Sequence, residues 1–310
     1  MRVAVMGTGG LGGYFGGLLA RAGHAVTFIA RGAHLEAMRR RGGLTVRAVD
    51  GEWFAPGQAV AAPEDDPADL VLFTVKSYHT EEAAALIGPV VGAQTAVLSL
   101  QNGVDNEEVL ARTYGAGRVL GGVVYILAAV QAPGVVQQTA GPRTVVFGEW
   151  QGGMSDRVRR LEGVLAEAGW RVTASEDVVR EKWVKFAFIC ALGGMTALTR
   201  LPIGEIRASP PTWAMFRQIV EEVVAVGRAR GVPLGPEVVE AHLELAQRLE
   251  PEATSSLHHD LTGGRRLELE ALHGTVVRFG REAGVPTPAC SAVYAALLPH
   301  DRRARASTHA

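Results

Sequence analysis

The amino-acid sequence predicts an α/β fold: a doubly wound parallel sheet in the first half of the chain, followed by an all-helical second domain. Segments patterned like strands and like helices alternate up to about residue 174, which is typical of a parallel sheet. Beyond Ser175, apolar residues recur at helical spacing. The length of 310 residues is that of two ordinary domains. We therefore expect domains at 1–174 and 175–298, and a disordered tail at 299–310.

The first half contains five strand-like runs, each short and rich in apolar and β-branched residues. They are Arg2–Met6, Ala25–Ala30, Leu70–Val75, Thr95–Leu100 and Arg118–Val123. Helices are predicted between them at Tyr14–Ala22, His34–Arg41, Glu81–Ile87 and Asn106–Tyr114. Two further β-rich pieces, Val135–Thr139 and Thr144–Phe147, flank Ala140-Gly141-Pro142 and predict an added hairpin. A helix over Ser155–Ala168 and a short strand near Val172 complete this domain.

The second half contains only helical patterns. They cover Trp183–Leu198, Trp213–Arg230, Glu237–Leu249, Leu267–Ala283 and Ala289–Leu298. Two Gly-Val-Pro stretches, at 231–233 and 284–286, are typical stops between helices. We expect this domain to be built from helices alone.

A glycine-rich string directly follows the first predicted strand. It reads Gly7-Thr8-Gly9-Gly10-Leu11-Gly12, and a helix is predicted soon after it. A strand, a G-x-G-x-x-G loop and a helix in this order form the dinucleotide-binding fingerprint of Rossmann domains. The first glycine permits a tight turn, the second lets the backbone approach a pyrophosphate, and the third lets helix and strand pack closely. The N–H groups at the start of the helix then bind the anion. We expect residues 7–12 to bind a dinucleotide.

The residue after the second predicted strand indicates which dinucleotide is bound. An acidic side chain near this position bonds the ribose hydroxyls of NAD, whereas an arginine suits the 2′-phosphate of NADP. The chain has Arg31 here. Arg39, Arg40 and Arg41 follow and are expected on the solvated surface, with the alternative that one of them joins Arg31. We therefore expect NADPH as the cofactor in preference to NADH.

Composition argues against several classes of partner. A net charge of −1 gives no reason to expect nucleic acid or an anionic membrane. No apolar run reaches the roughly 20 residues that span a bilayer. Cys190 and Cys290 have no metal or redox spacing, and His258-His259-Asp260 lacks the spacing of a helical ligand pair, so no metal is expected. We expect a cytoplasmic protein with a small-molecule substrate; the helical half is compatible with a homodimer.

A few polar residues stand where chemistry could occur. Lys76 and Asn102 follow the third and fourth predicted strands, and ligands of parallel sheets bind beyond the carboxyl ends of strands. Each also has a plain interpretation, a solvated lysine and an Asn-Gly turn. Lys185 lies in an apolar helix, where its ammonium either reaches water along its stem or lines a site and donates a proton. Helical spacing alone places Glu268 and Glu270 on a solvated face.

Several short motifs occur in order along the chain. They are the glycine string, Val75-Lys76, Gln101-Asn102-Gly103, Glu181-Lys182-Trp183-Val184-Lys185, Thr196-Ala197-Leu198, Ser255-Ser256-Leu257 with Asp260, and Arg265-Arg266-Leu267-Glu268-Leu269-Glu270. In this order they resemble the 2-dehydropantoate 2-reductase (ketopantoate reductase) family. The resemblance extends from residue 1 to about Leu298.

This resemblance implies a reaction and a set of roles. The family uses NADPH to reduce a 2-oxo acid, ketopantoate, to a 2-hydroxy acid in pantothenate biosynthesis. The resemblance implies that Lys185 is the general acid, that Glu268 binds and orients the substrate, and that Ser256 contacts the substrate carboxylate. For Glu268 it replaces the solvated-face interpretation. The remaining residues, which border the nicotinamide and substrate or hold the 2′-phosphate, are Asn102, Lys76 and Arg31.

The chain departs from the family pattern on the lysine helix. Ketopantoate enzymes usually carry asparagines four and eight residues after the lysine, on one helix face. Here those positions are Ile189 and Gly193. A site that hydrogen-bonds a substrate hydroxyl discriminates by a factor of about 10⁴ through such groups. The departure therefore favours a bulkier or more apolar 2-oxo acid, or another carbonyl compound, over ketopantoate.

Two other functions remain open from the sequence. A non-catalytic NADPH-binding protein would explain the lost amides, and the retained Lys185 and Glu268 argue against it. An opine-type dehydrogenase, which forms an amino acid on a similar two-domain plan, would differ in requiring an amine as a second substrate.

Overall fold

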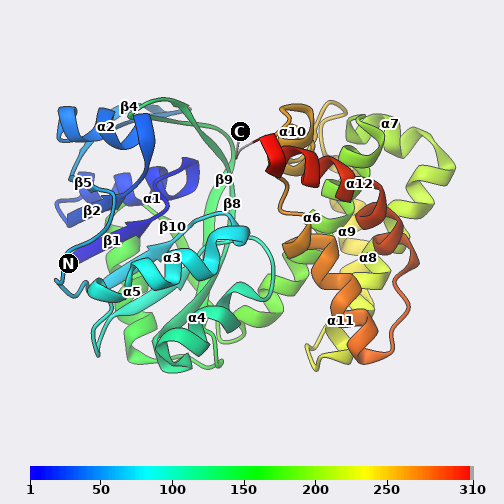
Figure 1. Ribbon diagram of the computed structural model, residues 1–310. Coiled ribbons are helices and arrows are strands. Elements are labelled where there is room, and N and C mark those ends of the chain that lie inside the picture. Colours follow the sequence, from blue (N-terminus) through cyan, green and yellow to red (C-terminus); the bar gives the residue numbers. More distant parts are fainter. Residues whose placement is uncertain (308–310) are drawn as a thin grey trace. The chain divides into compact units, whose positions relative to one another are not determined.

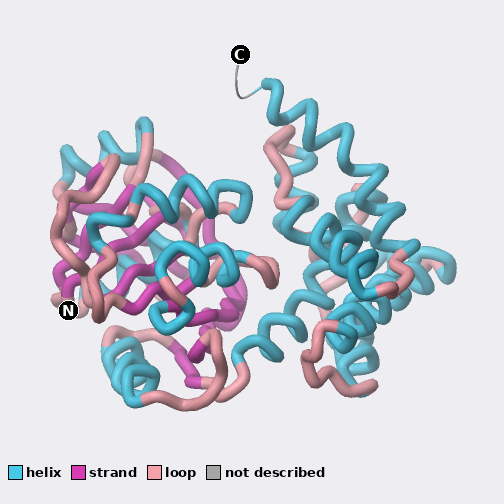
Figure 2. The backbone as a smooth tube through the Cα atoms, turned by 60° about the horizontal axis from the view of Figure 1, so that its bottom comes forward, coloured by secondary structure: helices cyan, strands magenta, loops and turns pink. Residues whose placement is uncertain are grey.

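The computed structural model describes residues 1–307 and divides into two compact units. The first comprises residues 1–101 and 106–178, and the second comprises residues 102–105 together with the chain from Val179 onward. Among the described residues all strands belong to the first unit, and the second unit is helical (Figure 2). The structure places the boundary at 178 rather than 174, and it assigns the short segment 102–105 to the helical unit.

The first unit is built on one mixed sheet. Its strands among the described residues are β1 (Arg2–Met6), β2 (Ala25–Ile29), β3 (Gly43–Ala48), β4 (Gly51–Pro56), β5 (Gln58–Val60), β6 (Leu70–Phe73), β7 (Ala96–Ser99), β8 (Val119–Ala132), β9 (Val135–Glu149) and β10 (Arg171–Ala174). Their order is β4-β3-β9-β8-β7-β6-β1-β2-β5, with β10 beside β9. The strands β2, β1, β6 and β7 are parallel neighbours. The Rossmann-type sheet predicted from the sequence is thereby confirmed.

Helices cover both faces of this sheet. They are α1 (Gly10–Arg21), α2 (Gly32–Arg41), α3 (Thr80–Leu86), α4 (Asn106–Tyr114) and α5 (Asp156–Glu167) (Figure 1). Alternate side chains of a strand point to opposite faces, so β1 contributes to two separate cores. Val3 and Val5 pack in a cluster with residues of α1 and α5, whereas Ala4 and Met6 pack with residues of α3 and α4.

The added hairpin differs from the one that we expected. The two pieces Val135–Thr139 and Thr144–Phe147 are not two strands but parts of the single strand β9, which pairs antiparallel with β8. The turn lies earlier, at Gly134, whose φ is +75°. Gly141 also has a positive φ, and it lies where the register between the two strands shifts. The glycine and proline therefore mark an irregularity within a strand rather than its end. The strands β3, β4 and β5 were not predicted.

The second unit is centred on a long apolar helix, α6. Its elements are α6 (Val178–Thr199), α7 (Ile203–Ala208), α8 (Pro210–Ala229), α9 (Glu237–Arg248), α10 (Ser256–Thr262), a π-helical turn (Glu270–Gly274), α11 (Thr275–Ala283) and α12 (Pro288–Ser307). Trp183, Phe186 and Cys190 of α6 are buried in the core that the surrounding helices share. None of the helices in residues 1–307 combines the length and the apolar character that crossing a membrane requires.

The expected disordered tail is largely helical. We expected residues 299–310 to be disordered, but α12 continues through Pro299 to Ser307, and residues 308–310 lie outside the described part of the chain. The reason is burial beyond the proline. Asp301 is fully buried, accepts a hydrogen bond from the backbone N–H of Leu267 at 2.8 Å and pairs with Arg305. These contacts stabilise the helix although proline removes one backbone donor.

Asp301→Ala is expected to lower the free energy of unfolding by about 1–3 kcal/mol, because the buried N–H of Leu267 would lose its acceptor. Asp301→Asn keeps an oxygen acceptor and should recover part of the loss. Urea unfolding measures both, with the exposed neighbour Arg303→Ala as control. An Asp301→Ala variant as stable as the control would show that the contact contributes nothing.

Candidate active site

The glycine-rich loop joins β1 to α1 in the first unit. Thr8 bonds the carbonyl oxygen of Ile29 through both its backbone N–H, at 3.1 Å, and its hydroxyl, at 3.0 Å, which ties the loop to the end of β2. Gly7 has a φ of +95°. A Cβ on Gly12 would lie 2.4 Å from the carbonyl oxygen of Gly7, so only glycine permits this close approach of helix and loop.

The start of α1 has the properties of an anion site. No side chain caps the helix at Gly9, and its first turn contains no acidic residue. A Cβ on Gly9 would meet no atom within 4 Å, so the backbone here is open to a ligand. Free N–H groups and the helix dipole together favour a negative charge at such a place. The loop therefore fits the pyrophosphate of a dinucleotide.

Arg31 stands immediately before α2, at the end of β2. Its guanidinium is exposed and donates a hydrogen bond to Glu82 at 2.7 Å, and this contact lowers the pKa of Glu82 below its ordinary value. Exposed ion pairs are weak, so a phosphate could replace Glu82 as the partner. Arg39 lies two turns further along α2 and bonds Glu36 and the carbonyl oxygen of Ala59 instead. The guanidinium of Arg31 is therefore held by an exposed ion pair, whereas that of Arg39 also bonds the backbone.

A buried polar network holds the loops after β6 and β7. The side-chain N–H₂ of Gln101 donates to the carbonyl oxygen of Val75 at 3.0 Å and to the Thr80 hydroxyl at 2.9 Å. The same hydroxyl lies 2.9 Å from the side-chain oxygen of Asn106. Because Val75 precedes Lys76, the network fixes the start of the loop that carries Lys76 in the first unit.

The second unit contains the most closely connected group of candidate residues. The ammonium of Lys185, on α6, donates to the side-chain oxygen of Asn102 at 2.8 Å. Asn102 belongs to the segment 102–105, in which Val104 is buried in the helical core. In the same segment Asp105 accepts hydrogen bonds from Thr275 at 3.1 Å and from Arg278 at 2.7 Å. The segment is therefore anchored to the helical unit just after Asn102, whose side chain bonds Lys185.

The environment of Lys185 changes its acidity. Burial and the nearby positive charge of Lys182 lower the pKa of Lys185, the carboxylate of Glu268 raises it, and the result is a pKa of about 7. Desolvation penalises the charged amine, and a second cation adds repulsion. A lysine with this pKa can both donate and accept a proton near neutral pH, as a general acid–base catalyst must.

The backbone around Glu268 is fixed on both sides, and its side chain is buried. The N–H of Leu267 bonds Asp301, and the carbonyl oxygen of Glu268 accepts from Leu272 at 3.1 Å. Residues 265–268 precede the π-helical turn and are not helical, unlike the continuous helix that we expected over Leu267–Ala283. This is why helical spacing misplaced Glu268 on a solvated face.

The adjacent serines Ser255 and Ser256 differ in their surroundings. Ser255 caps α10 by accepting the N–H of His258 at 3.0 Å, and its hydroxyl lies 2.8 Å from that of Thr196. Ser256 is the first residue of α10 and is exposed. Of the two, Ser256 is therefore the serine that is exposed to solvent.

Ile189 and Gly193 continue the face of Lys185 along α6. Ile189 is partly buried against the helical core. A Cβ on Gly193 would meet Leu257 of α10 at an ordinary contact distance of 3.6 Å. Neither position carries a polar side chain.

Lys182 stands in one of the motifs named above, but its influence on Lys185 was not predicted; it is buried on α6 one turn before Lys185. A signal was present in the composition. The chain has three lysines, Lys76, Lys182 and Lys185, against 28 arginines. Lysine readily shifts its pKa whereas arginine does not, so the few positions that keep lysine are candidates for chemistry.

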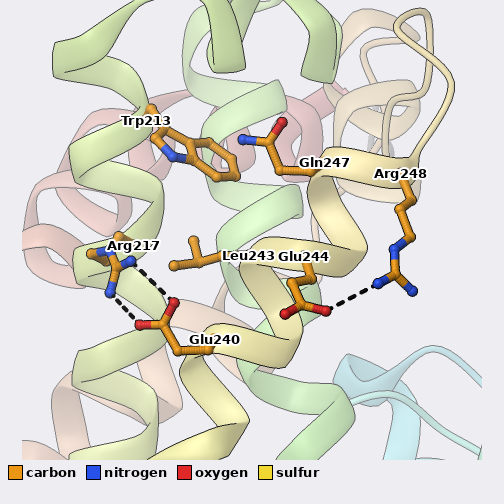
Figure 3. Close-up of a pocket in the computed structure, with 7 residues that line it drawn as sticks. All are labelled: Trp213, Arg217, Glu240, Leu243, Glu244, Gln247 and Arg248. Atoms are coloured by element: carbon orange, nitrogen blue, oxygen red, sulfur yellow. Dashed lines mark hydrogen bonds and ion pairs between the residues drawn. The ribbon is translucent and has the colours of Figure 1, made fainter.

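A shallow pocket lies elsewhere in the second unit, between α8 and α9 (Figure 3). Trp213 and Leu243 form its apolar part. Its charges satisfy one another: Arg217 bonds Glu240 at 2.8 Å, and Arg248 bonds Glu244 at 3.0 Å. None of the candidate site residues lines it.

Comparison with known proteins agrees with the motif series. The family model described as ketopantoate reductase PanE/ApbA matches residues 3–152, and that of the C-terminal part of the same family matches residues 177–300. A 2-dehydropantoate 2-reductase of Archaeoglobus fulgidus is 35% identical over 285 residues, which cover 92% of each chain.

Solved structures show the same fold. That of a PanE/ApbA family ketopantoate reductase from Ralstonia eutropha JMP134 is similar at a TM-score of 0.89 and 35% identity, covering 98% of this chain and 99% of that one. A D-mandelate dehydrogenase solved with NADH and anilino(oxo)acetate has a TM-score of 0.90 at 21% identity, covering 98% of this chain and 99% of that one, a likeness of fold.

Proposed function

The chain belongs to the ketopantoate reductase PanE/ApbA family of NAD(P)-dependent oxidoreductases that act on CH–OH groups, and we propose that it reduces a 2-oxo acid to a 2-hydroxy acid with NADPH. The observation that carries the proposal is the group formed by Lys185, Asn102 and Glu268 in the second unit. Lys185 is a proton donor with a pKa of about 7, Asn102 accepts its hydrogen bond, and the carboxylate of Glu268 raises its pKa.

The residues divide the reaction between them. When bound, NADPH supplies the hydride that the C2 carbonyl carbon receives. Lys185 then donates its proton to the carbonyl oxygen, on which the electron pair of the broken C=O π bond develops as negative charge. Asn102 holds the ammonium in place through the 2.8 Å hydrogen bond. Glu268 and Ser256 orient the substrate, and Ser256 bonds its carboxylate.

The proposed substrate class is a 2-oxo acid with an apolar group beyond C2. Ile189 and Gly193 offer no hydrogen bond to a substrate hydroxyl, so the hydroxyl of ketopantoate would have no partner at these two positions. An apolar substituent would instead gain by contact with Ile189, at about 0.8 kcal/mol for each buried methylene group.

The glycine loop and Arg31 are proposed to bind NADPH. Residues 7–12 would hold the pyrophosphate at the start of α1, and Arg31 would exchange Glu82 for the 2′-phosphate. Lys76 would border the nicotinamide.

Arg31→Ala is expected to raise the Kd for NADPH about tenfold while leaving that for NADH within twofold, because only NADPH carries the 2′-phosphate and charge-assisted hydrogen bonds contribute about 1.5–3 kcal/mol. Fluorescence titration with both nucleotides measures the two constants, and Arg160→Ala, an exposed arginine of α5, is the control. An unchanged ratio of the two constants would remove Arg31 from the cofactor site.

Isotope transfer tests the proposed reaction. With NADPH deuterated on the reactive face of C4, the purified protein should convert 2-oxoisovalerate into a 2-hydroxy acid that carries deuterium at C2, as mass spectrometry would show. Nucleotide binding without any such product, for this and other 2-oxo acids, would instead support a non-catalytic NADPH-binding protein. A product formed only when an amine is added would indicate an opine-type dehydrogenase.

A further inference from the structure

Three histidines from three different elements bond backbone carbonyl groups of α6. His242 of α9 bonds the carbonyl oxygen of Val184 at 2.6 Å. His258 of α10 bonds that of Thr196 at 2.8 Å, and His273 of the π-helical turn bonds that of Cys190 at 3.0 Å. A carbonyl only accepts, so each bonded ring nitrogen carries a proton.

His273 is the most deeply placed of the three. It is fully buried, and burial lowers its pKa to about 4, so the ring is neutral at physiological pH. Its Nε2–H faces Cys190, and its Nδ1 has no hydrogen-bond partner. A Cβ on Gly194 would lie 2.5 Å from Nε2, so the ring reaches α6 only because residue 194 is glycine.

The turn that carries His273 is connected to the three candidate catalytic segments. Leu272, its neighbour, donates its N–H to the carbonyl oxygen of Glu268 at 3.1 Å. Thr275, at the other end of the turn, donates to Asp105 in the segment of Asn102. His273 itself bonds the helix that carries Lys185. Single π-helical turns are frequently found at functional sites.

We propose that His273 is a positioning residue: by bonding α6 it sets the placement of Glu268 relative to Lys185. This inference rests on the proposed function and deepens it. His273 touches neither substrate nor cofactor in this account. The charged groups that act on Lys185 are Lys182, one turn earlier on α6, and Glu268, from the segment before the π-helical turn, while the third contact, Asn102, is neutral. Displacing Glu268 removes the one influence that raises the pKa of Lys185, so that pKa falls.

Because the chain has few lysines, the pKa of Lys185 can be measured without any substrate. Protein grown with ¹³Cε-lysine has three labelled residues, and Lys185→Met and Lys182→Met assign the signals. In the wild type the signal of Lys185 should titrate near pH 7. In His273→Leu, which cannot donate to Cys190, we expect this midpoint to fall by at least about 0.5. His273→Gln, whose amide nitrogen reaches the place of Nε2, should restore it.

His242→Leu is the matched control, because it removes the same kind of bond to α6 from a helix that carries none of the candidate site residues. It should leave the titration of Lys185 unchanged. In turnover of a 2-oxo acid, His273→Leu should lose roughly 10- to 100-fold in kcat/KM while the Kd for NADPH stays within twofold. If His273→Leu does not fold, Gly194→Ala displaces the unaltered ring and should shift the titration in the same direction.

The outcomes separate the two claims. A wild-type protein that reduces no 2-oxo acid would overturn the proposed function, and the titration would still decide the role of His273. A His273→Leu variant in which Lys185 titrates as in the wild type would overturn the positioning role, whatever the activity. An equal shift in His242→Leu would also overturn it, because the effect would then come from loosening α6 in general.

Discussion

Lys185→Met is expected to lower kcat for reduction of a 2-oxo acid by about 10²- to 10⁴-fold, because the carbonyl oxygen would lose its general acid. Methionine has nearly the shape of lysine without the charge. The Kd for NADPH should stay within twofold, since the proposed nucleotide site lies in the first unit. Steady-state kinetics and a nucleotide titration measure the two effects, and a kcat within threefold of the wild type would contradict the role of Lys185.

The pH dependence follows from the lowered pKa of Lys185, which is about 7. Reduction needs the protonated amine, so kcat/KM should be constant below pH 7 and fall about tenfold for each further pH unit. Oxidation of the 2-hydroxy acid needs the neutral amine and should show the opposite trend. Lys185→Arg keeps the positive charge but cannot release its proton near neutrality, so it should lose activity and the break in the profile together.

The lowered pKa of Lys185 also predicts how the stability of the folded chain depends on pH. The amine binds its proton less tightly in the folded chain, at a pKa of about 7, than in the unfolded chain, near 10.5. Stability should therefore rise with pH between these values, and the penalty is fully present below pH 7. Lys185→Met removes the penalty, so its unfolding midpoint at pH 6 should equal or exceed that of the wild type. This control separates lost catalysis from lost folding.

The double substitution Ile189→Asn with Gly193→Asn is expected to shift specificity toward ketopantoate. Two amides would then follow Lys185 on one face of α6 and could bond the substrate hydroxyl. Such groups discriminate by as much as about 10⁴, and we expect the ratio of kcat/KM for ketopantoate to that for 2-oxoisovalerate to rise by at least about 10². The first atom of a side chain at 193 meets Leu257 at 3.6 Å, so the site has room for it.

Ile189→Leu with Gly193→Ala is the control for this variant, because it alters the shape of the same positions without adding a hydrogen-bonding group. It should leave the ratio of the two kcat/KM values within about threefold, a change of roughly 0.6 kcal/mol or less. A double-asparagine variant with the specificity of this control would mean that Ile189 and Gly193 do not contact the substrate.

Much of the first unit could be predicted because its signals are local. An apolar strand, a glycine loop and a helix follow each other within residues 2–21, and each signal depends only on neighbours in the sequence. The hairpin prediction was wrong for a physical reason. Glycine and proline at 141 and 142 can either end a strand or distort it, and only the pairing with β8 determines which of the two occurs. The prediction of a disordered tail was wrong because Pro299 is a local stop signal, whereas Asp301 is buried by contacts with residues distant in the sequence.

In the candidate site, too, residues with a local signal could be predicted and residues that depend on long-range contacts could not. Lys185 stood out as a charge in an apolar helix, but Glu268 looked solvated because the π-helical turn after it breaks the expected periodicity. The motif resemblance, rather than periodicity, indicated its role. His273 and Asp105 could not be found at all, since their importance lies in bonds to Cys190 and Thr275, far from them in the chain.

The most direct test of the central claim is the rate of NADPH oxidation at 340 nm by the purified protein across a panel of 2-oxo acids that includes ketopantoate and 2-oxoisovalerate. We expect turnover that depends on the 2-oxo acid, with higher kcat/KM for members with an apolar substituent than for ketopantoate. Absence of turnover with every member of the panel, while NADPH still binds, would contradict it.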